Sequence, residues 1–332
     1  MRIKNLTSGG IITNYSCLSQ CAHCLYNSSP FREKDFMTIE MEIKVFRKIK
    51  DLGCNYVHIG GGEPFLNPES LYRVLKVAKK EGISVEYVET NASWFRGVDR
   101  DYDILKGLKD TGVDTILISI SPFHNEYIPL ERVRELIIAC DHVGIRILPW
   151  IIEFYYEIEK LGYGKHSLQD FEKFYGRDYI MKLPERYWIK MLGRAGITFK
   201  RYMKSFSVNQ ILEKSGPCIE LLNTTHFHID LYGNYIPGLC AGIGLDFNDI
   251  DYGFYRNKYP LVNILLEEGV RGLYRTATTE YNYKAKNEYL DKCDLCQDIR
   301  RFFARNNYFL SELKPVKFYE EIERYEKLME AK

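Results

Sequence analysis

The first 150 residues alternate short apolar segments with amphipathic helical patterns, and this alternation restricts the fold more than any other feature of the chain. Apolar residues recur at helical spacing over 39–53, and the β-prone segment YVHIG follows directly. The same order then recurs along this part of the chain. Each helical pattern ends in glycine just before the next strand, as a helix C-cap does. A βα series of this kind predicts a parallel sheet with helices outside it.

The strands are expected where the apolar, β-prone segments lie. They cover 10–16, 56–60, 83–91, 115–121 and 145–152, with a sixth over WIKMLG at 188–193. Six strands are fewer than the eight of a closed barrel, so an open partial barrel and a doubly wound sheet both fit. In either architecture, ligands bind at the carboxyl ends of the parallel strands.

The alternation breaks at two places along the chain. The segment 155–187 is aromatic and helical in pattern, with Ser167 as the expected N-cap of one helix. After about residue 200 the pattern becomes a hairpin, a tyrosine-rich stretch, a CxxC and two terminal helices. We therefore expect an α/β unit over 1–200 and a smaller α+β domain over 201–332.

Composition excludes several classes of partner. The 332 residues are 45% hydrophobic and 27% charged, with a formal net charge of +1, so a nucleic-acid or anionic-membrane partner is not expected. No apolar run approaches the roughly 20 residues that span a bilayer, and the N-terminus lacks a signal-peptide pattern. A cytoplasmic location follows as the default. In that reducing compartment, the nine cysteines are expected to include metal ligands.

Unusual residues follow each of the first four predicted strands. Three cysteines in CLSQCAHC follow the first, GGEP follows the second, Asn91 ends the third and Ser119 follows the fourth. A structural zinc site usually takes four ligands. A [4Fe-4S] cluster held by only three thiolates leaves one iron free to bind a substrate or a cofactor.

The combination of CxxxCxxC after the first strand with GGEP after the second resembles the radical S-adenosylmethionine (radical SAM) superfamily. The resemblance covers about residues 9–200 and implies a partial (β/α)6, TIM-like barrel. It implies that the free iron binds S-adenosylmethionine and that the reduced cluster cleaves it to a 5′-deoxyadenosyl radical. It also implies an electron donor of the flavodoxin or ferredoxin type.

The resemblance assigns roles to individual residues. Cys17, Cys21 and Cys24 match the cluster ligands, and His23 matches the residue beside the adenine. The remaining expected cofactor contacts are Gly61, Gly62, Glu63 and Pro64, which match the motif for the methionyl amino group, and Asn91, Ser119 and Arg194, which match polar contacts. Loop capping is the alternative for Asn91 and Ser119, and a surface ion pair is the alternative for Arg194.

Four cysteines remain clustered in the C-terminal third: Cys218, Cys240, Cys293 and Cys296. They are enough to saturate one [4Fe-4S] cluster or one zinc ion. Their layout resembles the SPASM and twitch extensions of radical SAM enzymes, and the single-cluster twitch form is the better match. One departure is that six residues separate Gly233 from Cys240, where the usual signature has the glycine four residues before the second ligand.

The predicted hairpin before Cys240 carries candidate catalytic residues. Strand alternation puts His226, His228, Asp230 and Tyr232 on one face, ahead of a turn at Gly233–Asn234. We take His226, His228 and Asp230 as candidate acid–base residues toward a polar substrate, with a solvated outer face as the alternative. Ala241 follows Cys240, where sulfatase-maturating and peptide-epimerising relatives carry a reactive side chain, so neither of those reactions is expected.

The sequence thus predicts a radical SAM enzyme that abstracts hydrogen from an unactivated C–H bond. The expected substrate is a ribosomally synthesised peptide. The alternative is a small-molecule dehydrogenase acting on a sugar or cyclitol. A hypothesis from a different functional class is an iron–sulfur or zinc protein without radical chemistry. The intact GGEP motif disfavours this hypothesis.

Overall fold

An eight-stranded sheet organises the computed structural model, which describes residues 2–253 and 255–331. Its strand order is β5-β4-β3-β2-β1-β7-β8-β9, and β6 and β10 form a separate two-stranded sheet. The strands are β1 (Gly9–Ile12), β2 (Tyr56–Gly60), β3 (Ser84–Thr90), β4 (Thr115–Ile118), β5 (Arg146–Pro149), β6 (Phe206–Ser207), β7 (Phe227–Asp230), β8 (Asn234–Ile236), β9 (Leu245–Asp246) and β10 (Glu288–Tyr289).

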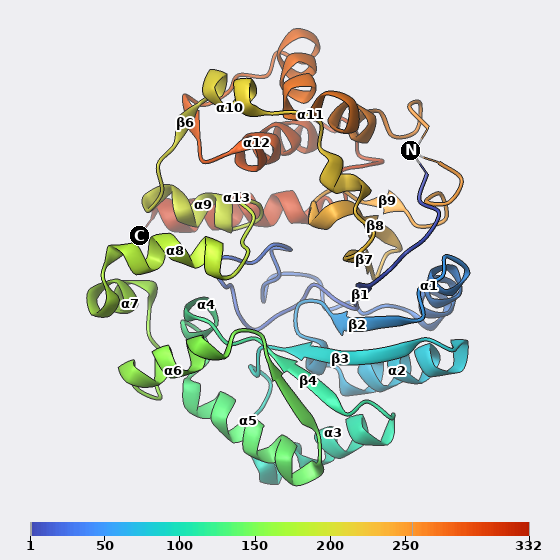
Figure 1. Cartoon of the computed structure of the whole chain (residues 1–332), viewed down its shortest axis with the longest axis vertical. Coiled ribbons are helices and arrows are strands. Elements are labelled where there is room, and N and C mark those ends of the chain that lie inside the picture. Colours follow the sequence, from blue (N-terminus) through green and yellow to red (C-terminus); the bar gives the residue numbers. More distant parts are fainter. Residues whose placement is uncertain (1, 254, 332) are drawn as a thin grey trace.

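The helices lie on both sides of this sheet. They are α1 (Ile39–Asp51), α2 (Pro68–Glu81), α3 (Val98–Asp110), α4 (Pro122–Asn125), α5 (Leu130–Val143), α6 (Ile152–Leu161), α7 (Leu168–Tyr175), α8 (Arg177–Arg186), α9 (Ala195–Thr198), α10 (Val208–Lys214), α11 (Pro260–Glu280), α12 (Lys292–Arg305) and α13 (Lys317–Glu330). Figure 1 shows α2, α3 and α5 along one side of the sheet and α11, α12 and α13 on the other.

The five βα strands predicted from the sequence are all present, and β1 to β5 pair in parallel. Helix α1 shows why the pattern predicts well. Thr38 caps its N-terminus by accepting a hydrogen bond from the Met41 amide, and Val45, Phe46 and Ile49 are fully buried on one face. Gly82 takes the left-handed conformation that ends α2.

The predicted helical insertion is confirmed. It consists of α6, α7 and α8, and Ser167 is the N-cap of α7 in a capping box with Asp170.

The predicted sixth strand at 188–193 is wrong. Its hydrogen bonds go elsewhere: the Gly193 amide donates to the Gln297 side chain, and Gly193 adopts φ +60° against the Cys24 carbonyl. The sixth parallel strand is instead β7, which pairs with β1 along its whole length. β7 was expected only as one half of a hairpin, and it does form that hairpin with β8.

The sheet therefore crosses residue 200, the predicted boundary between two domains. β1 lies between β2 on one side and β7 on the other. The strands on either side of residue 200 share one sheet. The domain boundary at this residue stays a prediction. Across the described ranges, none of the helices combines the length and the apolar character that a membrane crossing requires.

Helix α11 was not expected, since its segment read only as tyrosine-rich. It begins at Pro260, and the hydrogen-bond acceptor for its first free amides is a side chain that lies far along the chain. The buried Glu312 carboxylate accepts hydrogen bonds from the amides of Leu261 at 3.0 Å and Val262 at 2.7 Å. A carboxylate at this position satisfies two of the unpaired N–H groups at the helix N-terminus.

We expect Glu312→Ala to lower the free energy of unfolding by about 1–3 kcal/mol, because two buried amides lose their acceptor. The measurement is the midpoint of denaturant unfolding, followed by circular dichroism of the full chain. Glu320→Ala on α13 is the matched control, since Glu320 is exposed, forms a surface ion pair with Lys317 and should change little. Equal midpoints for the two variants would contradict this function of Glu312.

Candidate functional site

A cavity of about 280 Å³ opens at the carboxyl ends of the first four parallel strands. The three N-terminal cysteines lie in its wall together with the loops that follow β2, β3 and β4. The lining includes Cys17, Ser19, Cys21, His23, Cys24, Tyr26, Ser28, Gly61, Gly62, Pro64, Glu89, Thr90, Asn91, Ser119, His124, Tyr187, Trp188, Lys190, Arg194 and Leu239. Seven of the eight predicted cofactor contacts are in this set, and Glu63 is not.

The three thiols of this loop are held close together and largely out of solvent. Cys17 and Cys21 are buried, and the Cys24 amide donates to the Cys21 carbonyl at 3.0 Å. Burial raises the pKa of the Cys17 thiol to about 12 and raises that of Cys21 well above its usual value. Asn91 donates from its side-chain amide to the Cys17 sulfur at 3.2 Å. Such a donor stabilises a thiolate that binds a metal.

Gly61 and Gly62 allow the β2 loop to touch the cysteine loop. The Gly62 amide donates to the Asn14 carbonyl at 2.8 Å. A Cβ on Gly62 would lie 2.0 Å from the Ser16 carbonyl oxygen, and one on Gly61, at φ +148°, would lie 2.7 Å from that of Asn14. The sequence interpretation attributed these glycines to the approach of a ligand. The structure adds a second cause, the close approach of the chain segment that leads into Cys17.

Glu63 is not among the residues that line the cavity. Its carboxylate is fully buried and accepts hydrogen bonds from the Thr90 hydroxyl and from the amides of Asn91 and Phe65. Burial raises its pKa to about 7. Glu63 therefore joins the ends of β2 and β3, and its expected contact with a cofactor stays a prediction.

Four buried polar atoms in the cavity wall have no protein partner among the described residues. They are the hydroxyls of Ser19, Tyr26 and Ser28 and the Nδ1 of His23. A buried polar group without a partner costs about 1–3 kcal/mol, so native proteins rarely leave several together. This concentration around the cysteine loop fits a polar ligand that satisfies them.

His23 lies in an aromatic cluster within this wall. Its ring stacks on Phe123 at 4.4 Å between centroids and meets Tyr187 edge-on at 4.9 Å. Burial lowers the pKa of His23 well below its usual value, so the ring is neutral. A neutral ring in an aromatic cluster suits the planar, uncharged face of an adenine.

Arg194 is fully buried and holds the cysteine loop by its backbone. Its guanidinium donates to the Cys21 carbonyl and to the Ser28 carbonyl, each at 2.8 Å. The alternative of a surface ion pair is wrong. The neighbouring Gly193 lies against the other side of the loop, where a Cβ would come within 2.4 Å of the Cys24 carbonyl.

The four C-terminal cysteines form a second set. Their thiols influence one another's pKa: Cys218 is affected by Cys296 and Cys240, and Cys293 by Cys240 and Cys296. The loops that carry Cys218 and Cys240 touch closely, since a Cβ on Gly238 would lie 2.0 Å from the Glu220 carbonyl.

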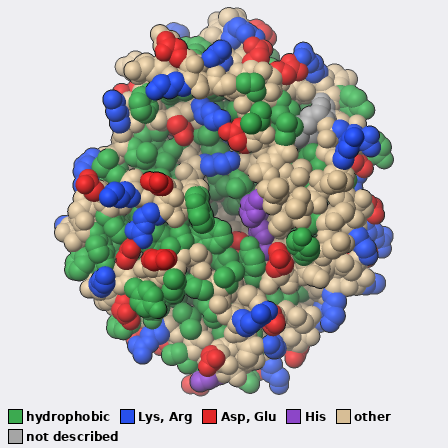
Figure 2. All heavy atoms as spheres, in the orientation of Figure 1, with side chains coloured by type: hydrophobic (Ala, Val, Ile, Leu, Met, Phe, Trp, Pro, Cys, Tyr) green, Lys and Arg blue, Asp and Glu red, His purple; other side chains and the backbone are tan. Residues whose placement is uncertain are grey.

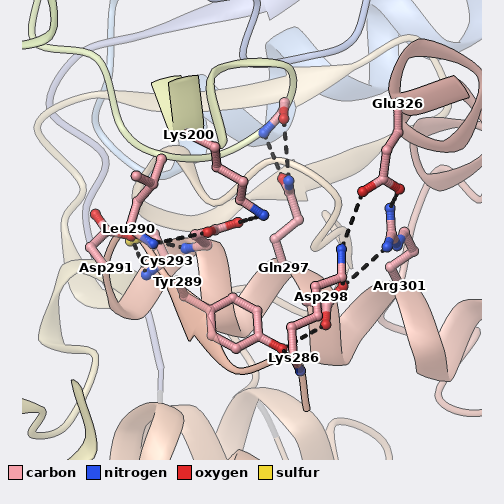
Figure 3. Close-up of polar contacts among 12 residues, drawn as sticks. Lys200, Lys286, Tyr289, Leu290, Asp291, Cys293, Gln297, Asp298, Arg301 and Glu326 are labelled. Atoms are coloured by element: carbon pink, nitrogen blue, oxygen red, sulfur yellow. Dashed lines mark hydrogen bonds and ion pairs between the residues drawn. The ribbon is translucent and has the colours of Figure 1, made fainter. Parts of the chain in front are cut away.

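Cys293 and Cys296 lie in the first turns of α12, which is anchored on several sides (Figure 3). Asp291 caps the helix by accepting from the Cys293 amide at 2.8 Å. Gln297 exchanges two hydrogen bonds with Gly193, directly before Arg194. Asp298 accepts a hydrogen bond from Arg301 at 3.1 Å. These contacts fix the CxxC relative to the first cysteine loop.

Cations surround the second set of thiols. Burial raises the pKa of Cys240, whereas Lys190 and Arg300 lower it. Arg300 is buried, interacts with Cys296, and donates to the Ala241 carbonyl at 2.9 Å. Positive charge next to buried thiols favours the thiolate forms that bind metals.

The three candidate catalytic residues, His226, His228 and Asp230, are not among the residues that line the cavity. The Asp230 carboxylate is fully buried and is occupied by protein donors, including the Tyr15 hydroxyl at 2.9 Å and the Asn234 side chain at 3.0 Å. The two histidines face His58 on β2. Their predicted acid–base function stays a prediction.

Sequence reasoning missed several residues of the cavity wall, among them Glu89, Tyr187 and Lys190. Glu89 lies inside β3, where strand alternation could have placed it on the inner face with Tyr87. Tyr187 follows the last helix of the insertion and Lys190 lies in the segment that was wrongly predicted as a strand, and no local pattern marks either residue. Lys190 donates to the Gly238 carbonyl at 2.6 Å and so lies between the cavity and the second cysteine set.

Comparison with known proteins gives a partial match. Residues 11–143 match the family model described as the radical SAM superfamily. This segment contains the first three cysteines and Gly61–Pro64, so this part of the chain carries a radical SAM domain, as those motifs predicted. The match ends before Gly193 and before the four C-terminal cysteines.

Individual relatives are distant. A GTP 3′,8-cyclase from Aquifex aeolicus (strain VF5) is 28% identical over 147 residues, which make up 40% of this chain and 42% of the cyclase. The chain thus spans less than half the length of this curated relative. Streptococcus suis SuiB bound to the precursor peptide SuiA aligns at TM-score 0.35 with 15% identity, over 90% of this chain and 73% of SuiB. For anSMEcpe with bound AdoMet the TM-score is 0.46 and the identity 12%, over 90% of this chain and 97% of that one.

We expect Arg194→Lys to loosen the first cysteine loop although it keeps the positive charge. A lysine ammonium cannot reach both carbonyls as the guanidinium fork does, and losing one charged hydrogen bond costs about 1.5–3 kcal/mol. Hydrogen–deuterium exchange of peptides within 17–28 should become about tenfold faster or more.

Arg201→Lys, at an exposed position, is the control and should leave exchange unchanged. Peptides from α5 serve as an internal reference for global unfolding. Unaltered exchange over 17–28 in Arg194→Lys would contradict the positioning function of Arg194.

Proposed function

We propose that this chain is a radical SAM enzyme with two iron–sulfur clusters that modifies a peptide. The observation that carries the proposal is the cavity wall in which three cysteine thiols, Gly61–Gly62 and four unpartnered polar atoms meet at the carboxyl ends of parallel strands. A ligand with one metal-binding end and several polar groups satisfies all of these features together.

The residues fit a [4Fe-4S] cluster held by Cys17, Cys21 and Cys24, with S-adenosylmethionine in the adjoining cavity. Together these cofactors supply a 5′-deoxyadenosyl radical that removes a hydrogen atom from an unactivated C–H bond. The protein's own part is to bind and to exclude water. His23 offers its neutral ring face, and the backbone of Gly61–Gly62 and the Ser119 and Asn91 side chains offer polar contacts.

We infer a second cluster at Cys218, Cys240, Cys293 and Cys296. The influence of these thiols on one another's pKa supports a shared site, and four cysteine thiolates are the usual ligand set of a [4Fe-4S] cluster.

The mouth of the cavity supports a peptide as substrate. Trp188 lies in the cavity wall, is 73% exposed, and packs edge-on against Trp150 at 5.7 Å. Figure 2 shows further hydrophobic side chains beside the central hollow. Exposed aromatic and other hydrophobic groups around a cavity suit the side chains of a peptide.

We expect Cys17→Ala/Cys21→Ala/Cys24→Ala to bind about four irons per chain after anaerobic reconstitution, against about eight in the parent protein. It should form no 5′-deoxyadenosine with S-adenosylmethionine and dithionite. Cys293→Ala/Cys296→Ala should also lose about four irons but keep a first cluster that cleaves S-adenosylmethionine. The measurements are iron and sulfide content and chromatography of the nucleoside product.

Cys140→Ala is the control, since Cys140 lies in the buried face of α5, away from both sets. A parent protein that holds eight irons yet forms no 5′-deoxyadenosine would refute the radical assignment. Zinc bound by Cys218, Cys240, Cys293 and Cys296 would refute the second cluster.

For the substrate, we expect Trp188→Ala to raise the KM for a peptide about tenfold, as the loss of an exposed aromatic anchor does at a binding surface. The assay offers peptides encoded beside the gene and measures mass change and 5′-deoxyadenosine. Phe174→Ala, an exposed aromatic on α7, is the matched control. Turnover of sugars or cyclitols, with no response to any peptide, would favour the small-molecule dehydrogenase.

A further inference from the structure

Three histidines from two distant parts of the chain converge beside the first strand. His58 lies on β2, His228 lies on β7, and His226 directly precedes β7. One ring nitrogen from each lies within 4.8 Å of the other two. The Nε2 atoms of His58 and His228 are 3.2 Å apart. Three or more histidine, cysteine or acidic side chains this close together can bind a single metal ion, and these three histidines form such a group among the described residues.

The glycine between these strands makes the convergence possible. Gly10 of β1 pairs with His58 on one side and with His228 on the other. A Cβ on Gly10 would lie 2.1 Å from the His58 Nε2. The two imidazoles therefore meet over a position that has no side chain. Glycine weakens the interior of a strand relative to alanine, and it often marks a place where another group approaches the backbone closely.

The spacing and chemistry of the donors fit a metal ion. Two imidazole nitrogens bound tetrahedrally at 2.0–2.1 Å from zinc lie about 3.3 Å apart, close to the 3.2 Å between His58 and His228. The Glu89 carboxylate lies 3.6 Å from the His58 Nε2. A nearby carboxylate stabilises a divalent cation held by neutral imidazoles.

The group is separate from both cysteine sets, but it adjoins the cavity. Glu89 and Tyr26 line that cavity, and the Tyr26 ring meets the His228 ring edge-on at 5.7 Å. Figure 2 shows histidine side chains in the hollow near the centre of the face in view. His226 is half-buried, so an ion can reach the group from outside.

We propose that His58, His226 and His228 bind one divalent transition-metal ion, with zinc as its representative, and that this ion links β7 to β2 across Gly10. An ordinary hydrogen bond between two histidines would account for the pair at 3.2 Å. It does not account for the third imidazole, whose ring nitrogen also lies within 4.8 Å of the other two. The proposal does not depend on the radical chemistry, since it concerns different ligands and a different ion.

The test uses the full chain with its cysteines already loaded with iron and sulfide under anaerobic conditions. One equivalent of ZnCl2 is added, the protein is desalted, and zinc is counted by mass spectrometry. We expect about one zinc per chain. X-ray absorption at the zinc edge should show imidazole nitrogens at about 2.0–2.1 Å and no sulfur at about 2.3 Å.

His226→Asn is the decisive variant because its half-buried position tolerates substitution. We expect its zinc content to fall at least tenfold with the iron content unchanged. His58→Gln should give the same loss, and His142→Asn, on the exposed face of α5, should bind zinc like the parent. Thermal unfolding adds a readout, since zinc should raise the midpoint of the parent and not that of His226→Asn.

Less than about a tenth of an equivalent of zinc in the parent, full zinc retention in His226→Asn, or sulfur ligation in the absorption spectrum would each overturn the proposal. None of these results bears on the formation of 5′-deoxyadenosine, so the failure of one proposal is distinguishable from the failure of the other.

Discussion

The buried guanidinium of Arg194 is the contact on which the arrangement of both cysteine sites depends. It holds the carbonyls of Cys21 and Ser28, and its neighbour Gly193 exchanges two hydrogen bonds with Gln297 on α12. The same short segment therefore touches the loop of the first three cysteines and the helix that presents Cys293 and Cys296. A displacement of this segment would move both sets of thiols, and an arginine is suited here because its planar fork serves two acceptors at once.

Much of the fold was predictable because the relevant forces are local. The glycine-terminated helices and the apolar strands of the first 150 residues are confirmed, since capping and amphipathic periodicity act within a few residues. The sixth strand was misplaced for the opposite reason. WIKMLG has the composition of a strand, but Gly193 bonds to Gln297, far along the chain, and the vacant edge of β1 is taken by β7. Helix α11 was not predicted because its N-terminal amides donate to Glu312 and not to a neighbouring capping residue.

The residues of the candidate site also differ in whether the local sequence marks them. The cysteines and the glycines of GGEP were identifiable from spacing alone, and they do meet in one cavity. Tyr187, Lys190 and Glu89 could not be identified, since nothing in their local sequence reports which wall they face. His58 is an intermediate case. A histidine inside the apolar strand YVHIG is unusual, but only the register of three strands shows that it faces His228 across Gly10.

The position of β1 has a consequence for how the chain reaches this structure. β1 is synthesised well before one of its two neighbours, β7, which lies far along the chain. Until that neighbour arrives, β1 presents an unpaired edge of the kind that recruits other strands. Its contacts with β7 also have large sequence separation, which slows folding. Two glycines at this edge, Gly9 and Gly10, offer little apolar side chain to a wrong partner. The absence of side chains at these glycines, which leaves room for two imidazoles in the folded protein, thus also makes β1 a poor template for aggregation before β7 pairs with it.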